Sequence, residues 1–72
     1  MLKSQTLSLD RSVDALKAVA EPTRLRLVVL LARHDLTVSD LTAILGQSQP
    51  RISRHLKLLV ESDVLDRYQE GA

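Results

Sequence analysis

The sequence contains no cysteine, tryptophan or phenylalanine, and only two glycines, two prolines and one tyrosine among 72 residues. The absence of cysteine excludes a disulfide scaffold and a thiolate-ligated metal site. Leucine, valine, isoleucine and alanine supply almost all of the apolar volume. That composition is typical of a bundle of helices.

The chain also lacks the length and the apolar runs that other classes of protein need. A domain of this size buries only about 60% of the surface that its unfolded chain exposes, so a large enclosed cavity would consume most of its core. The longest apolar run, Leu27–Ala32, is far below the roughly 20 residues that span a bilayer. Met1–Asp10 has no apolar run like that of a signal peptide. We therefore expect a cytoplasmic binding module with no membrane partner rather than an enzyme.

The net charge of +1 is divided unevenly along the chain. Residues 47–60 carry three basic side chains, Arg51, Arg54 and Lys57, and no acidic one, whereas residues 61–72 are mainly acidic. A wholly basic segment beside an acidic one is typical of a nucleic-acid-binding element.

Apolar spacing and terminal signals predict four helices, at about 9–20, 22–33, 38–45 and 49–61, after a flexible arm or a helix lead-in at 1–8. Glu21-Pro22 separates the first two helices because the residue before proline avoids the helical region. Thr37 with Asp40 resembles a capping box, and Gly46 ends the third helix. Ser48 is the expected N-cap of the fourth helix.

The second helix is apolar around most of its circumference, which predicts that it is the buried centre of the domain. The stripe of Val13, Leu16 and Val19 on the first helix fits either the core or a dimer surface. After Glu61 the alternation over 64–69 predicts a strand, and Glu70-Gly71 predicts a hairpin turn. Because no second strand follows, we expect the chain to be a piece of a longer protein.

Two short helices joined by a tight glycine turn predict a helix-turn-helix, whose second helix lies in the major groove of DNA. At about 100° per residue, Ile52, Leu56 and Leu59 share one face of helix 49–61. Arg54 and Lys57 fall on the opposite face. The basic side chains therefore point away from the core and toward a partner.

Three segments resemble the ArsR-type winged-helix repressors in the order that this family has. Ala20-Glu21-Pro22-Thr23-Arg24-Leu25-Arg26-Leu27 resembles the opening signature, and Leu36-Thr37-Val38-Ser39-Asp40-Leu41 resembles the first helix of the motif. Ser48-Gln49-Pro50-Arg51-Ile52-Ser53-Arg54-His55-Leu56-Lys57-Leu58-Leu59 resembles the recognition helix. The resemblance covers about residues 13–71.

The resemblance implies a mainly α winged helix-turn-helix over 9–72, with four helices and the first strand of a wing hairpin that the chain leaves incomplete. It also implies a homodimer that binds double-stranded DNA and regulates transcription, most simply as a repressor. The positions expected at or near bases are Ser48, Gln49, Ser53 and Arg54. The positions expected at phosphates are Thr37, Ser39, Arg51, His55 and Lys57.

Metal-sensing members of the family often carry Cys-x-Cys where this chain has Thr37 and Ser39. Hydroxyls are poor ligands for thiophilic metals, so we expect neither a metal nor a cofactor here, and the effector stays open. The segment Gly46–His55 and the final residues Glu70-Gly71-Ala72 also resemble ArsR-type modules fused to S-adenosylmethionine-dependent methyltransferases. Two functions are alternatives to DNA binding. The chain could be a regulatory segment of such an enzyme, or a winged-helix module that binds a protein partner.

Several polar residues have two interpretations on sequence alone. Arg24 and Arg26 suit either ion pairs with Glu21 or Asp14, or phosphate contacts. His55 suits either a hydrogen bond at the edge of the core or a phosphate contact. His34 is too distant in sequence from His55 to predict a metal site, and side chains two apart on a helix, such as Ser53 and His55, do not form a catalytic pair.

Overall fold

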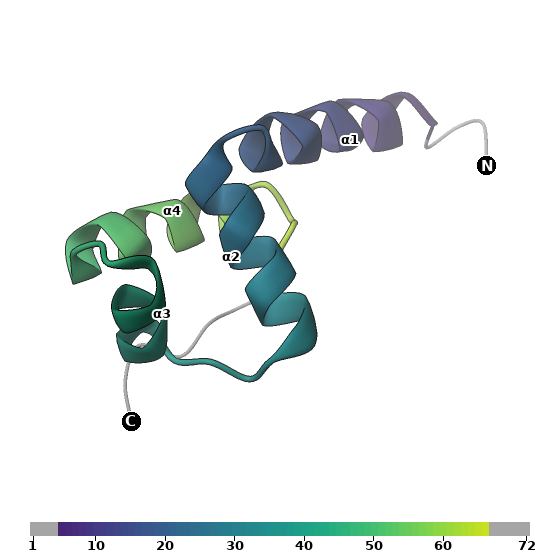
Figure 1. The fold of residues 1–72 in the computed structure, drawn as a ribbon. Coiled ribbons are helices and arrows are strands. Elements are labelled where there is room, and N and C mark those ends of the chain that lie inside the picture. Colours follow the sequence, from purple (N-terminus) through teal and green to yellow (C-terminus); the bar gives the residue numbers. More distant parts are fainter. Residues whose placement is uncertain (1–4, 67–72) are drawn as a thin grey trace.

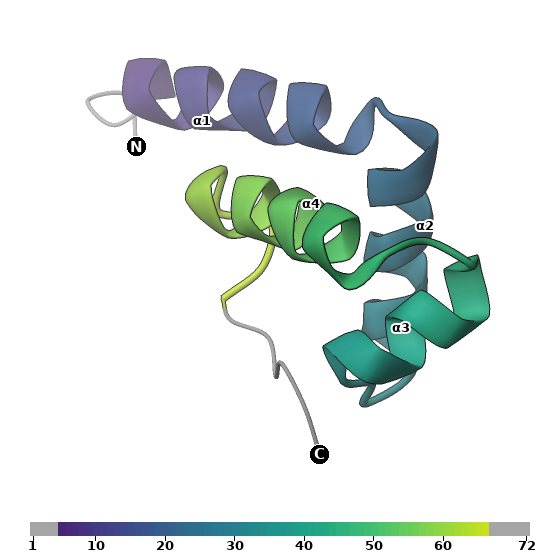
Figure 2. The ribbon, with the colours of Figure 1, turned by 90° about the vertical axis from the view of Figure 1, so that its left-hand side faces the viewer.

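The computed structural model describes the backbone of residues 5–66 and the side chains of residues 9–66. This part of the chain consists of four helices: α1 (Gln5–Val19), α2 (Pro22–Arg33), α3 (Val38–Leu45) and α4 (Gln49–Glu61) (Figure 1). Figure 2 shows α4 between α1 and α3, with α2 crossing one end of the group. Contacts join α4 to each of the other three helices. The prediction of a mainly α fold is confirmed.

The predicted boundaries of α2, α3 and α4 are confirmed because each depends on a local signal. Pro22 lies in the first turn of α2, where its missing N–H costs no hydrogen bond. Thr37 and Asp40 form a reciprocal capping box at the start of α3, and Gly46 ends that helix in the left-handed conformation with φ 66°. The hydroxyl of Ser48 accepts a hydrogen bond from the backbone N–H of Arg51 at the start of α4.

The first helix is longer than the sequence predicts. It begins at Gln5 instead of about residue 9, so the backbone of residues 5–8 is helical. No glycine or proline stands between Gln5 and Ala20 to stop the helix from extending toward the N-terminus. Apolar periodicity detects only the amphipathic part of a helix, so it placed the start too late.

The core is made of seven buried apolar residues, of which α4 contributes the most. They are Ala18, Leu27, Val38, Leu41, Ile52, Leu56 and Leu59. The three from α4 are completely buried and share the face that the sequence predicts. No charged side chain is buried in the part of the chain that the structure describes. The basic face of α4 is therefore held in place by apolar packing beneath it.

The expectation that α2 is the buried centre is only partly right. Leu27 is fully buried, but Leu25 and Val29 are 51% and 47% exposed. With Ile44 of α3 they line an open apolar groove between α2 and α3. A helix that is apolar around most of its circumference does not show which side has a neighbour, and here α4 and α1 cover only one side. The central position belongs to α4 instead.

The end of α4 is closed by its own backbone rather than followed at once by a strand. The N–H of Val64 bonds to the carbonyl of Leu59 at 2.9 Å and the N–H of Asp63 to that of Val60 at 3.0 Å. This is a Schellman motif, with Asp63 at the left-handed position that glycine usually occupies. The predicted strand is therefore absent at 64–66, and its remainder at 67–69 lies outside the described residues.

Replacing Asp63 with glycine is expected to stabilise the domain by about 0.5–1 kcal/mol, because glycine has no steric penalty at positive φ. Asp63 has φ 61° and its side chain is exposed. Thermal unfolding followed by circular dichroism measures the effect as a rise of several degrees in Tm. Asp66→Gly, at another exposed aspartate, is the control, and an equal rise in both variants would contradict the role of the backbone conformation.

Candidate nucleic-acid interface

One whole side of α4, the second helix of the α3–α4 pair, is exposed to solvent. Only Gly46, Gln47 and Ser48 separate the two helices. The left-handed backbone of Gly46 turns the chain sharply, and nothing lies within 4 Å of the place where a Cβ would be. The glycine is therefore required by backbone conformation rather than by lack of space.

The predicted basic face of α4 is exposed as a unit. Gln49, Arg51, Arg54 and Lys57 are exposed, and Ser53 is half-buried at the margin of the core. Within residues 9–66, none of the three cations makes an ion pair. Their charges are therefore available to a partner that carries phosphates.

Thr37, the N-cap of α3, is less suited to a phosphate contact than the sequence indicates. The N–H of Thr37 already donates to the carboxylate of Asp40 at 2.9 Å, and the Thr37 hydroxyl accepts from the N–H of Asp40. The Asp40 carboxylate is exposed beside them and repels an anion. Ser39 is exposed, and its carbonyl is occupied by the hydroxyl of Thr42. We therefore assign Thr37 to the capping box.

The structure supports the first of the two interpretations of His55. Its Nδ1 lies 3.3 Å from Nη1 of Arg24, and its Nε2 lies 3.7 Å from a carboxylate oxygen of Glu21. Both ring nitrogens face the first turn of α2, so they are directed at protein groups and not at the outer face of α4. Arg24 in turn donates to the carbonyl of Ala18, whereas Arg26 is exposed at the edge of the α2–α3 groove.

A second polar contact, which the sequence did not reveal, joins α2 to the turn before α4. The side-chain amide of Gln47 donates to the hydroxyl of Thr23 at 3.0 Å. The two residues are 24 positions apart, and no local pattern links them. Their proximity follows only from the packing of α4 against α2.

The carboxylate of Glu21 caps α2 and is held in its ionised form. It accepts hydrogen bonds from the backbone N–H groups of Thr23 and Arg24. Partial burial raises the pKa of Glu21, but these two hydrogen bonds and the charges of His55 and Arg24 outweigh it, so the pKa lies below its ordinary value. Folding therefore favours the ionised carboxylate.

Acid is expected to weaken the fold partly through Glu21. Because its pKa is lowered on folding, its contribution is present above the ordinary value of 4.5 and is lost as the pH falls through the lower pKa of the folded state. Urea unfolding at several pH values between about 6 and 3 should show a smaller loss of stability in Glu21→Gln than in the parent protein. Glu61→Gln, at an exposed residue, should keep the parent's pH dependence, and identical curves for Glu21→Gln and the parent would contradict the assignment.

Other kinds of site have no support in residues 9–66. No group of three or more His, Asp or Glu side chains there is arranged to hold a metal ion. None of the helices in the described part is both long and apolar enough to cross a membrane. The exposed side of α4 is the strongest candidate for a functional surface.

A short capped helix, a tight turn and a second helix with a buried apolar face and an exposed basic face define a helix-turn-helix protein. Residues 21–67 match the family described as bacterial regulatory protein, arsR family. The chain belongs to this family. The matched segment runs from the N-cap of α2 to just beyond the end of α4 and includes the whole of the motif.

Several curated proteins share this region. The arsenical resistance operon repressor of Escherichia coli is 51% identical over 59 residues, which are 79% of this chain and 50% of that protein. The transcriptional repressor SdpR of Bacillus subtilis is 33% identical over 81% of this chain and 64% of its own length. The arsenic resistance transcriptional regulator ArsR1 of Pseudomonas putida is 45% identical over 76% of this chain and 44% of its own length. The chain thus spans about half the length of these relatives. No solved structure matches it significantly.

Proposed function

We propose that the chain is the part of a transcriptional repressor that binds double-stranded DNA sequence-specifically, with α4 in the major groove. The observation that carries this proposal is the exposed basic face of α4, which has no acidic neighbour from residue 47 to residue 60 and lies opposite three buried apolar residues. The relatives are named as repressors or transcriptional regulators, which supports the same function. A repressor of this kind acts in the cytoplasm.

The side chains of α4 divide into two groups by chemistry. Arg54 suits a bidentate contact to guanine, and Gln49 suits one to adenine. Both are exposed. Ser48 and Ser53 lie beside them, and the Ser48 hydroxyl keeps its proton for donation while it caps the helix. Arg51, Lys57 and Ser39 then contact phosphates and fix the register of the helix on the duplex.

A wing formed after α4 belongs to this proposal as well. Residues 67–72 lie outside the described part, and the observation behind the wing comes from the start of α3. The backbone of Thr37 is extended, with φ −87° and ψ 169°, and forms a β-bridge just before α3. A strand of the wing would add to the same edge of the domain.

The chain offers hydroxyls rather than thiolates at the start of α3. It contains no cysteine, so these 72 residues do not bind thiophilic metals such as arsenic or mercury through sulfur.

The test is to select duplexes from a random pool with the whole chain, and then to measure binding of a selected duplex and a scrambled one by fluorescence anisotropy at several salt concentrations. We expect tighter binding of the selected duplex, with log K falling linearly as log[salt] rises. Equal affinity for both duplexes would contradict sequence-specific reading. Salt-sensitive binding of polyglutamate without any preference for DNA would instead support a module for an acidic protein partner.

We propose further that two copies pair through α1. Leu9, Val13 and Leu16 follow one another at i, i+4 and i+7, so they lie on one face of the helix. All three are exposed, Leu16 by 65%. A second copy placed on this stripe covers apolar surface that no described residue covers, and it gives two recognition helices for two half-sites.

Leu16→Glu is therefore expected to convert a dimer to a monomer, because a charge buried in an apolar interface loses its solvation. Light scattering after size-exclusion chromatography measures the mass. The matched control is Leu25→Glu, which puts the same charge at an exposed leucine of the α2–α3 groove and should leave the dimer intact. A monomeric parent protein, or loss of the dimer only in Leu25→Glu, would refute pairing through α1.

A further inference from the structure

Directional contacts to α4 and to the turn before it come from one place, the first turn of α2. Thr23 accepts the hydrogen bond of Gln47 just before α4 begins, at 3.0 Å. Arg24 donates to His55 halfway along α4, at 3.3 Å. Consecutive residues of α2 thus hold the recognition helix at two separate points.

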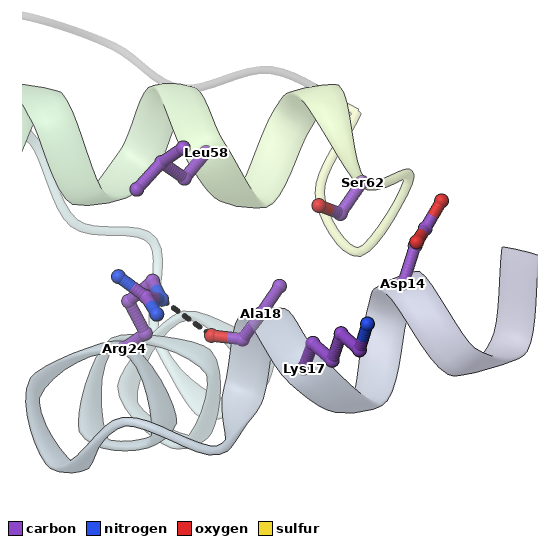
Figure 3. Close-up of a pocket in the computed structure, with 6 residues that line it drawn as sticks. All are labelled: Asp14, Lys17, Ala18, Arg24, Leu58 and Ser62. Atoms are coloured by element: carbon purple, nitrogen blue, oxygen red, sulfur yellow. Dashed lines mark hydrogen bonds between the residues drawn. The ribbon is translucent and has the colours of Figure 1, made fainter.

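Arg24 is itself fixed from a third helix. Its Nε donates to the carbonyl of Ala18 in the last turn of α1. Figure 3 shows the Arg24 side chain in the space between α1 and α4, with the bond to Ala18 drawn and Leu58 of α4 facing it across that space. The guanidinium therefore bridges the C-terminal end of α1 and the middle of α4.

The chemistry of Arg24 also fixes the protonation pattern of His55. Arginine is always protonated in proteins and only donates hydrogen bonds. When His55 is neutral, Nδ1 must therefore be the acceptor and the ring proton lies on Nε2, which faces the Glu21 carboxylate at 3.7 Å. In this form His55 has no free acceptor for another group.

Apolar packing alone does not define how α4 is oriented. Ile52, Leu56 and Leu59 bury it firmly, but hydrophobic burial is non-directional and tolerates small sliding or rolling of a helix. Hydrogen bonds need defined distances and angles. A base-reading side chain must be held within about 0.5 Å and 10–20° of its productive position. The two hydrogen bonds, one to the turn before α4 and one to the middle of α4, therefore matter more for sequence recognition than for the stability of the fold.

We propose that Thr23 and Arg24 are positioning residues for DNA recognition: through Gln47 and His55 they set the orientation of α4, without touching DNA themselves. This inference rests on the proposed function. Sequence preference then depends partly on residues of α2 that lie behind α4, in addition to the exposed residues of α4 that face the bases.

Two pairs of substitutions test the proposal. His55→Leu removes the acceptor for Arg24, while His55→Asn keeps an acceptor oxygen near the place of Nδ1. Thr23→Val removes the acceptor for Gln47, while Thr23→Ser keeps it. We define the specificity ratio as the affinity for the selected duplex divided by the affinity for the scrambled duplex. In the Leu and Val variants we expect this ratio to fall about three- to tenfold. The Asn and Ser variants should retain the ratio within about twofold.

His34→Leu is the matched control, because His34 is the other histidine and is exposed at the end of α2. All variants are compared at a temperature where circular dichroism shows them folded. A folded His55→Leu protein that keeps the parent's ratio would overturn the proposal, as would an Asn variant impaired as much as the Leu variant. Failure of the parent protein to prefer any duplex would refute the proposed function itself.

The contact between Arg24 and His55 has a readout that does not involve DNA. Nitrogen NMR at a pH of about 8, where histidine is neutral, reports which ring nitrogen carries the proton. We expect Nε2–H in the parent protein and a mixture of the two tautomers in Arg24→Ala. A parent protein with the proton on Nδ1 would overturn the proposal whatever the DNA measurements show.

Discussion

Replacing Leu56 with alanine is expected to lower the free energy of unfolding by about 2–5 kcal/mol. Leu56 is completely buried in the centre of α4, and truncating its side chain leaves a cavity in the apolar core. A domain of this size has a total stability of about 4–10 kcal/mol, so a large part is lost. Urea unfolding must be followed by circular dichroism, because the chain has no tryptophan.

Leu58→Ala is the matched control two residues further along the same helix. Leu58 is 39% exposed, so the same truncation removes less buried surface and is expected to cost about 1 kcal/mol or less. Equal losses in the two variants would mean that α4 does not face the core as described. The comparison thus tests the orientation of the helix independently of DNA.

Arg54→Ala and Lys57→Ala are expected to weaken DNA binding in two different ways. Arg54→Ala removes the proposed base contact and should cost about 1–3 kcal/mol of discrimination between selected and scrambled duplexes. Lys57→Ala removes the proposed phosphate contact, so it should weaken binding of both duplexes alike and reduce the magnitude of the salt slope by about 1. The same anisotropy titrations measure both effects.

Arg11→Ala supplies the control for net charge. Arg11 is exposed on α1, and Figures 1 and 2 show that helix extending away from α3 and from the start of α4. Its loss changes the charge of the protein by the same amount and should change affinity little. If Arg11→Ala weakens binding as much as Lys57→Ala, the attraction is a property of total charge and not of the α4 face.

The features that the sequence predicted well are those with a local physical cause. Pro22, Gly46 and Ser48 each satisfy or interrupt helical hydrogen bonds within a few residues, so the limits of α2, α3 and α4 were predictable. The exposure of Arg54 and Lys57 follows from helical periodicity once Ile52 and Leu56 are placed inside. Whether these side chains meet DNA stays a prediction.

The features that escaped prediction depend on distant parts of the chain. The turn at Asp63 was missed because an aspartate stands where glycine is the usual signal. Arg24 and His55 are 31 residues apart, and a helical wheel places His55 only at the edge of the core, where a partner inside or outside is equally compatible. Only the packing of α4 on α2 and α1 distinguishes the two.

The central position of α4 has a consequence for how such a regulator is controlled. Because α4 contacts every other helix, it cannot detach or melt without exposing the whole core. We therefore expect local opening of this helix to cost as much as global unfolding, and its amides to belong to the slowest class in hydrogen exchange. An effector therefore has little scope to switch the domain off by reshaping α4. In the proposed dimer we therefore expect control through rigid-body displacement, which changes the separation of two otherwise unaltered reading helices.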